Sequence, residues 1–380
     1  MSAGKSALIA LSLTLSSACS NASDPDDPQL QGGAGSGGTG GGGNAQCGSG
    51  GTAAAGRSGA SGAGGALAGS NSGGEAGGVT SVPGQPRLAS FGSGVCALNS
   101  AGKIVCWGGR SSDPWDLPTT PFESLADEGL VCGLAADQSV TCVVPPGVTD
   151  NPSRVPKNDV LQLVMSGTGS CWVDLDNRAH CDAVLRTPAN TQFSQLSTGW
   201  YFACGIRTSD KQVECWGNAE AMAGCEPGIP ATDQLAAPAG AFRQISSNAY
   251  QSCGVREDGT LACWGAGEPA DDPKELLCDK ELNYGQATPP SGTFSQVSVG
   301  SSHACAVRAD GTLACWGAGK QTGDCASDID GCGQSAPPAD GGFVEVLAAN
   351  SNSCGMKSDG KVRCWGSNTF GRSTPPAELQ

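Results

Sequence analysis

The feature that most constrains how this chain can fold is a set of cysteine pairs at an almost constant spacing. Six of seven pairs have nine residues between their cysteines, and the fourth pair has ten. The first cysteines of successive pairs are 33 to 52 residues apart, a period typical of solenoids, propellers and other repeat arrays. The pairs are Cys96 with Cys106, Cys132 with Cys142, Cys171 with Cys181, Cys204 with Cys215, Cys253 with Cys263, Cys305 with Cys315 and Cys354 with Cys364.

The spacing within each pair predicts a β-hairpin stapled by a disulfide. In the sixth pair, a three-residue loop at 309–311 places Cys305 directly opposite Cys315. Opposed residues of antiparallel strands have Cα atoms about 4.5–5.5 Å apart, which is within disulfide range. Such a loop ends in a left-handed residue, a conformation that suits glycine and asparagine. That position is held by Gly102, Asn177, Gly259, Gly311 and Gly360.

Two repeats depart from this pattern. Gln138 stands at the left-handed position of the second repeat, where we expect it to break the turn rule. The extra residue of the fourth repeat predicts a longer loop around Asp210. A zinc array is the alternative use of so many cysteines, but the chain lacks the close Cys-x-x-Cys knuckles of zinc sites. We therefore expect disulfides.

The residues around each pair predict a sheet that is apolar on both faces. Alternation puts Cys305 and Val307 on one face and Ala304 and Ala306 on the other. Another strand is expected before the hairpins, at 193–197, 242–246, 294–299 and 343–347. Seven small sheets of this kind close into a ring that leaves only short edges, so the expected fold is an all-β, seven-bladed β-propeller.

Tryptophan and histidine are assigned structural roles. Five hairpins are followed by Trp-Gly, and we expect these indoles to pack between sheets rather than to bind sugars: Trp107, Trp216, Trp264, Trp316 and Trp365. Core packing is also expected for the three tryptophans outside the motif, Trp115, Trp172 and Trp200. His303 is expected to make a structural hydrogen bond, and His180 has no evident partner.

The repeat resembles a known one. The segment from Val297 to Gly317, which contains His-Ala-Cys-Ala-Val and ends in Cys-Trp-Gly, resembles the Regulator of Chromosome Condensation repeat. The resemblance covers about 88–370 and is weaker in repeats two and three. The cysteine-bearing variety is similar to the extracellular propeller of plant Crinkly receptor kinases and to exported bacterial relatives. The nuclear exchange activity of the family's eponymous member does not suit an acidic, exported chain.

The first residues predict export. Lys5, the apolar run 7–15 and the small residues before Cys19 resemble a bacterial lipoprotein signal, although Ser16 stands where that motif prefers leucine. We expect a signal peptide at 1–18, a lipid-anchored flexible Gly/Ser-rich tether at 19–85 with lipidation of Cys19, and the propeller at 86–380. Simple secretion, with Cys19 removed or unmodified, is the alternative. The repeats are expected near 88–122, 123–158, 159–191, 192–240, 241–292, 293–341 and 342–380.

Charge and histidine content exclude several functions. The formal net charge is −15, which repels phosphate backbones and argues against nucleic-acid binding. Two histidines argue against multi-histidine metal sites and histidine-dependent triads. We expect no cofactor and no metal, because the acidic residues near Asp328 do not fit the helix-loop calcium template, with Ala326 and Pro337 at its ends.

Long insertions after the Trp-Gly of repeats four, five and six are the candidate binding site. They lie near 218–234, 268–286 and 320–334, on adjacent sheets, and hold twelve acidic residues against three lysines. Long loops on a rigid scaffold are where binding sites concentrate. The candidate binding residues are Glu226, Asp271, Asp272, Glu275, Asp279, Asp324, Asp328 and Asp330.

Cysteines inside these insertions predict further bridges. Cys325 and Cys332 are expected to form a local disulfide, and Cys225 with Cys278 would tie neighbouring insertions. Rigidity of this kind lowers the entropic cost of binding. Ordinary solvated loops with stabilising bridges remain the alternative. Cys47 has no obvious partner.

These observations predict a non-catalytic, surface-exposed protein-interaction module at the outer membrane or cell surface, or otherwise secreted or periplasmic. Its expected partner is a protein or peptide of basic character, with membrane contact through the lipid anchor only, and the chain is expected to be a monomer. The alternative is an inhibitor of an extracellular or periplasmic enzyme, resembling the propeller-type β-lactamase inhibitor. A lyase or hydrolase is less favoured because no base, acid and electrophile converge.

Overall fold

The computed structural model describes residues 86–109, 116–128, 130–144, 155–182, 185–217, 234–248, 251–265, 284–320 and 332–380. Internal contacts divide the chain into two units, Met1–Asn71 and Ser72–Gln380. All described residues belong to the second unit. The predicted signal peptide, lipidated Cys19 and tether lie outside the described residues.

The described residues form seven three-stranded antiparallel sheets, each made of consecutive strands. Sheets one to four contain β1 (Leu88–Phe91), β2 (Gly94–Leu98), β3 (Ile104–Gly108); β4 (Ser124–Glu128), β5 (Leu130–Leu134), β6 (Val140–Val143); β7 (Val160–Ser166), β8 (Gly169–Asp174), β9 (Ala179–Cys181); β10 (Phe193–Thr198), β11 (Phe202–Arg207), β12 (Val213–Gly217). Sheets five to seven contain β13 (Phe242–Asn248), β14 (Gln251–Arg256), β15 (Leu261–Gly265); β16 (Phe294–Val299), β17 (His303–Arg308), β18 (Leu313–Gly317); β19 (Phe343–Ala348), β20 (Asn352–Lys357), β21 (Val362–Gly366).

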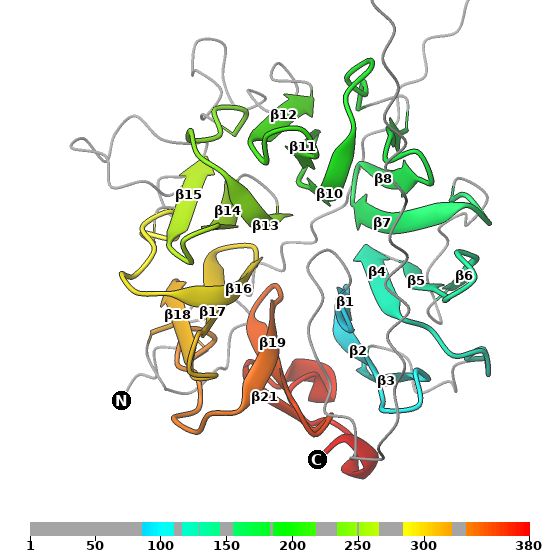
Figure 1. The fold of residues 1–380 in the computed structure, drawn as a ribbon. Helices are drawn as coiled ribbons and strands as arrows, with labels where there is room; N and C mark the ends of the chain where they lie inside the picture. Colours follow the sequence, from blue (N-terminus) through cyan, green and yellow to red (C-terminus); the bar gives the residue numbers. More distant parts are fainter. Residues whose placement is uncertain are drawn as a thin grey trace, which may run out of the picture. The chain divides into compact units, whose positions relative to one another are not determined.

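The sheets surround a common axis (Figure 1). The first strand of each sheet lies nearest the axis, and each contacts the first strand of the next sheet. Strand β19 contacts β1, so the series of contacts is closed. This is the predicted seven-bladed propeller. The four first strands predicted by residue range are all present, and three of them extend one or two residues further than expected.

All seven predicted hairpin disulfides are formed. Each joins directly opposed residues of the second and third strands, as in the register Cys305↔Cys315. The bridges are Cys96 to Cys106, Cys132 to Cys142, Cys171 to Cys181, Cys204 to Cys215, Cys253 to Cys263, Cys305 to Cys315 and Cys354 to Cys364.

The separation within these pairs differs from the expectation of about 4.5–5.5 Å between Cα atoms. The Cα atom of Cys106 is 4.1 Å from that of its partner, and the corresponding distances are 3.9 Å for Cys142 and 4.0 Å for Cys263. The bridged pairs are therefore slightly closer than the general range for opposed residues, while the direct opposition is as predicted.

The two cysteines of each bridge also differ in burial, which the sequence did not indicate. The first cysteine, on the middle strand, is completely buried in every sheet. The second cysteine, on the outer strand, is only partly buried: Cys106, Cys142, Cys181, Cys215, Cys263, Cys315 and Cys364. The cause is the position of the outer strand, which has a neighbouring strand on one side only. Burial of the bridge thus decreases from the middle strand to the outer strand.

The ten-residue interval of the fourth sheet keeps the same opposition, Cys204↔Cys215, because its turn is longer. That turn ends on Lys211 with φ +60°. The longer loop predicted around Asp210 is therefore present.

The expectation for Gln138 was wrong. Gln138 has φ +63°, and its N–H donates to the Ala135 carbonyl at 2.9 Å, as Gly311 N–H donates to Arg308. The hairpin register and the disulfide hold the turn in the left-handed form although a Cβ makes that form unfavourable. The long-range constraint therefore outweighs the local preference of one residue.

The two faces of one sheet belong to different parts of the core, as alternation predicted. In sheet six, Cys305, Val307 and Leu313 pack with Phe343 of sheet seven. Ala304, Ala306 and Trp316 pack with Cys253 and Val255 of sheet five. The Trp-Gly indoles thus pack against the preceding sheet, and four of them donate Nε1–H to a backbone carbonyl: Trp107 to Arg372, Trp264 to Gln234, Trp316 to Gln286 and Trp365 to Gln334.

The C-terminal residues complete the contact between sheets seven and one. After β21 the chain forms two short 3-10 turns, Thr369–Gly371 and Ala377–Leu379. Leu379 is 2% exposed and packs with Leu88, Trp107 and Met356. The Arg372 carbonyl accepts from Trp107 Nε1 at 2.8 Å, the role that the inter-sheet segments play elsewhere.

Candidate functional site

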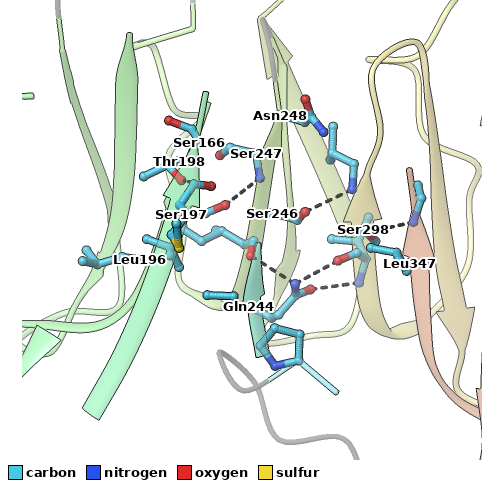
Figure 2. Close-up of a pocket in the computed structure, with 18 of the residues that line it drawn as sticks. Ser166, Leu196, Ser197, Thr198, Gln244, Ser246, Ser247, Asn248, Ser298 and Leu347 are labelled. Carbon is cyan, nitrogen blue, oxygen red and sulfur yellow. Dashed lines mark hydrogen bonds between the residues drawn. The ribbon is translucent and has the colours of Figure 1, made fainter. Parts of the chain in front are cut away.

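The seven first strands enclose an axial channel of about 190 Å³. Its walls are uncharged except for Glu345, which is the single ionisable side chain among the described residues that line it. Near the ends of the strands the wall includes Ser166, Thr198 and Asn248 (Figure 2). The described wall of the channel is therefore rich in hydroxyl groups and carries one ionisable side chain, inside an acidic protein.

Glutamine side chains join neighbouring sheets around this channel. Gln244 accepts the Val297 N–H at Oε1 and donates from Nε2 to the Val297 carbonyl, both at 2.9 Å. Each such amide satisfies a buried donor and a buried acceptor that face the neighbouring sheet. The same arrangement recurs at Gln162, Gln195 and Gln296.

Between sheets seven and one a glutamate takes this place. Oε1 of Glu345 accepts the backbone N–H groups of Arg87 and Leu88, each at 2.9 Å. Its Oε2 is buried and has no hydrogen-bond partner within the described part of the chain. Burial raises the pKa of Glu345 to about 7, although the two N–H groups act in the opposite direction. The closing contact of the ring therefore contains a titratable group.

Serine hydroxyls make a second set of contacts between sheets, two residues after the glutamines on the same strands. Ser197 Oγ accepts the Ser247 N–H, Ser246 Oγ accepts the Val299 N–H, and Ser298 Oγ accepts the Ala348 N–H, at 2.7, 3.0 and 2.9 Å. Figure 2 shows these three serines along the channel wall. They belong to sheets four, five and six, the sheets that carry the long insertions.

The three insertions leave their sheets on one side of the ring. The last residues of the outer strands, Gly217, Gly265 and Gly317, pair with the first residues of the second strands, Phe202, Gln251 and His303. The chain thus departs beside the starts of β11, β14 and β17. Equivalent residues of these strands bond one another, so the three departure points share one face, which we call the insertion face.

The candidate binding residues lie outside the described residues, and so do Cys225, Cys278 and Cys325. Their assignment remains a prediction, and so do the Cys325–Cys332 and Cys225–Cys278 bridges. Cys332 is described and buried. Within the described ranges, no group of three or more His, Cys, Asp or Glu side chains could hold a metal ion. No helix of the described segments is long and apolar enough to cross a membrane.

His303 has a structural environment. Its ring is completely buried, and Nε2 lies 2.8 Å from Ser353 Oγ in the next sheet. Ser353 donates to the Gln334 carbonyl at 3.0 Å, so the histidine donates to the serine. Burial lowers the pKa of His303 to about 3, which keeps the ring neutral. Substrate cannot reach this pair, because neither side chain is exposed.

The partner of His180, which the sequence did not reveal, is Asp174. The distance from Nε2 to Oδ2 is 2.6 Å, and the imidazole stacks on Trp172 with ring centroids 5.4 Å apart. Burial acts to raise the pKa of Asp174, but hydrogen bonds from His180 and the backbone lower it below the usual value. Trp172 is partly buried, as expected for packing, whereas Trp200 is 41% exposed at the channel. Core packing was thus the wrong expectation for Trp200.

The glutamines, the serines and Glu345 were missed at the level of sequence. A signal was present, because glutamine or glutamate stands two residues after phenylalanine in four repeats: Gln195, Gln244, Gln296 and Glu345. The position follows the strand start and falls on the face that meets the neighbouring sheet. An amide repeated there indicates an inter-sheet contact, which hydrophobic periodicity does not detect.

Comparison with known proteins supports this fold and repeat. Residues 294–321 and 350–372 match the sequence model of the Regulator of chromosome condensation (RCC1) repeat. The structure is similar to the CRINKLY WD40 ectodomain of the Arabidopsis thaliana receptor kinase ACR4, with a TM-score of 0.56 and 20% identity over 77% of this chain and 99% of that chain.

A second similarity is to the entire ectodomain of the Physcomitrella patens receptor kinase CR4. The TM-score is 0.55, with 19% identity over 75% of this chain and 74% of that chain. At this identity the similarity concerns the fold alone. The first matched segment contains all three strands of sheet six, and the second contains β20 and β21 of sheet seven; the other five sheets repeat the same strand order and disulfide. The chain is therefore a seven-bladed, disulfide-stapled propeller whose sheets six and seven contain matches to the Regulator of chromosome condensation repeat.

Proposed function

We propose that this protein is a non-catalytic protein-interaction module that binds a partner of basic character through the insertions of repeats four to six. The observation that carries the proposal is their common origin on the insertion face, together with their charge of twelve acidic residues against three lysines. A one-sided charge steers a complementary partner and raises its association rate.

The scaffold suits this role because it is rigid. Each of the three sheets that bear insertions has its own disulfide, and glutamine and serine side chains bond each sheet to the next. Loops held on such a support lose less entropy on binding. The histidine environments support a non-catalytic role, since His303 is inaccessible and His180 is held in a surface pair.

Seven hairpin disulfides indicate a protein outside the cytoplasm, because disulfides persist in oxidising compartments. Attachment to the outer membrane or cell surface through a lipidated Cys19 and the 19–85 tether is part of the proposal. Intact mass of the membrane-extracted protein tests it, since a diacylated and cleaved N-terminus adds a defined mass. An unmodified Cys19 would point to simple secretion.

The binding proposal is tested by capture with the mature, oxidised protein on a surface, exposed to envelope and secreted fractions of the source cell. In the test variant the eight candidate carboxylates of the insertions are changed to amides. The matched control carries Asp210→Asn, Asp258→Asn, Asp310→Asn and Asp359→Asn, at hairpin turns on the opposite face, where asparagine keeps the turn-capping oxygen.

We expect a partner that the wild type and the control retain, that the test variant loses and that high salt releases. If the test variant still retains the partner, the binding site does not lie in the acidic residues of the insertions. If the captured partner is an enzyme, its activity with and without the propeller decides whether binding is inhibitory.

A further inference from the structure

We propose that the axial channel is a binding site for a neutral sugar, a single pyranose ring that enters where the first strands end. Its lining residues are not those of the insertions, and the inference stands independently of the proposed function. Its grounds are the hydroxyl groups on one side of the channel, the apolar groups on the other side, the absence of a free charge among the described lining residues and an exposed indole at the mouth.

The hydroxyl side is formed by Ser197, Ser246 and Ser298. Each oxygen accepts a backbone N–H from the next sheet, which fixes the position of the hydroxyl. Each hydroxyl also carries a proton, and no group among the described residues accepts it. Ser197 and Ser246 are only partly buried, so their O–H groups face the channel as oriented donors. A sugar hydroxyl can accept such a bond and donate its own proton onward.

The other side of the channel is apolar at the same register position. Ser246 pairs with Cys253 of the adjacent strand. Val164 and Leu347 hold the equivalent positions, each opposite the first cysteine of its own sheet, and both side chains line the channel. Ala126 holds the equivalent position in the second sheet. A pyranose ring presents hydroxyl groups at its edge and C–H groups on its faces. A channel with one hydroxyl-bearing and one apolar wall matches that division.

The mouth of the channel adds an aromatic surface. Trp200 follows β10 and is 41% exposed, although tryptophan is strongly buried on average. Asn248, at the end of β13, adds a carboxamide to the lining of the channel (Figure 2). An exposed indole in the same lining as polar groups suits a ligand that combines C–H faces with hydroxyl groups.

The charge of the lining residues and the volume of the channel further limit the class of ligand. Glu345 is the single ionisable group among the described lining residues, and its carboxylate is occupied by the Arg87 and Leu88 N–H groups with the remaining oxygen buried. The described lining residues thus offer no counter-ion to a charged ligand, whose desolvation they would leave uncompensated. The volume of about 190 Å³ accommodates one six-membered ring, since a cavity of roughly 150 Å³ holds benzene.

The test measures binding of D-glucose, D-galactose and N-acetyl-D-glucosamine to the mature oxidised protein by saturation-transfer NMR and calorimetry. Glucuronate and glucosamine serve as charged counterparts. Trp200→Ala removes the indole, and Ser246→Ala removes one hydroxyl, whereas Ser246→Thr keeps it. Phe370→Ala is the matched control, because Phe370 is 45% exposed and does not line the channel. Melting temperatures establish that each variant is folded.

We expect saturable binding of at least one neutral sugar with a dissociation constant in about the millimolar range. Trp200→Ala and Ser246→Ala should weaken it about tenfold or more, the loss of one good contact. Ser246→Thr should lose less affinity than Ser246→Ala because it keeps the hydroxyl, and Phe370→Ala should leave the affinity unchanged. The proposal is overturned if no neutral sugar binds, if the charged sugars bind equally well, or if Trp200→Ala and Phe370→Ala behave alike.

Discussion

Replacing Glu345 by glutamine should stabilise the protein at neutral and alkaline pH. In the wild type, Oε1 of Glu345 accepts two N–H groups of sheet one, while Oε2 is buried without a partner among the described residues. The equivalent Gln296 instead accepts the Val346 N–H and donates to the Val346 carbonyl, at 2.9 and 3.0 Å. Glu345→Gln replaces the unpartnered oxygen by an amide group like that of Gln296 and removes the buried charge.

The magnitude follows from the pKa of this carboxyl. Burial raises the pKa of Glu345 from 4.5 to about 7, and each pKa unit corresponds to about 1.4 kcal/mol. Because the folded pKa lies above the unfolded pKa, the native state binds the proton more tightly. The wild type therefore loses stability as the pH rises from about 4.5 to about 7, by a total of about 3 kcal/mol.

The assay is urea unfolding of the oxidised mature protein across a pH series. Above pH 7 we expect Glu345→Gln to be more stable than wild type by about 3 kcal/mol, and we expect the difference to disappear below pH 4.5. The matched control is Gln296→Glu, which places a carboxylate at the equivalent contact between sheets six and seven. That variant should be destabilised at high pH and recover at low pH.

A stability difference between wild type and Glu345→Gln that does not change with pH would refute the reasoning. Equal stability above pH 7 would refute it as well. Either result would mean that the carboxylate finds compensation which the observed contacts do not provide.

Three further predictions concern the scaffold. Leu379→Ala should lower the free energy of unfolding in urea by about 2–5 kcal/mol, because Leu379 is buried between sheets seven and one. Leu175→Ala, at a site that is 50% exposed, should lower it little. Equal losses would exclude a closing role for the C-terminal residues. Gln138→Gly should raise stability by about 1 kcal/mol by relieving a φ of +63°, and a lower melting temperature would contradict the proposed cost of that turn. Full reduction of the disulfides should lower the melting temperature sharply, since each hairpin disulfide contributes up to roughly 2–3 kcal/mol in the chain-entropy model. An unchanged calorimetric melting curve after reduction would show that the disulfides do not stabilise the fold.

The parts of this protein that could be predicted are those governed by short-range geometry. A nine-residue interval between cysteines places them in direct opposition across a three-residue turn, and this opposition holds in six of the seven hairpins. Alternation then assigns Cys305 and Ala304 to opposite faces, as the two core clusters show. The expectation for Gln138 was wrong because it considered only the residue's own preference for negative φ. The strand register, held by the Cys132–Cys142 disulfide, imposes the positive φ instead.

Spacing could not predict how deeply each sulfur lies. Cys253 and Cys263 are equivalent in the sequence pattern, yet the first is completely buried and the second is partly exposed. The difference arises because only the middle strand of a sheet is covered on both edges. Burial of this kind is a property of strand order, which the pair spacing does not contain.

The candidate site was predicted only in outline. The positions of the insertions after Trp-Gly follow from the repeat, and the structure adds that their departure points share a face. The axial channel could not be inferred from the sequence, because it depends on hydrogen bonds that Ser246 and Gln244 make to a different sheet. Their hydrogen bonds reach Val299 and Val297, more than 50 residues away in the sequence.

By itself, the sequence determined the number of sheets, the hairpin disulfides, the two apolar faces and the acidic character of the insertions. These properties depend on residue type and on spacings of about ten residues, which the chain carries locally. The closure of the ring was decided only by the tertiary structure: Leu379 and Arg372 meet Trp107, and Glu345 meets Leu88, across more than 250 residues. No local pattern encodes a contact between the two ends of a repeat array, because it forms only after all seven sheets have taken their places.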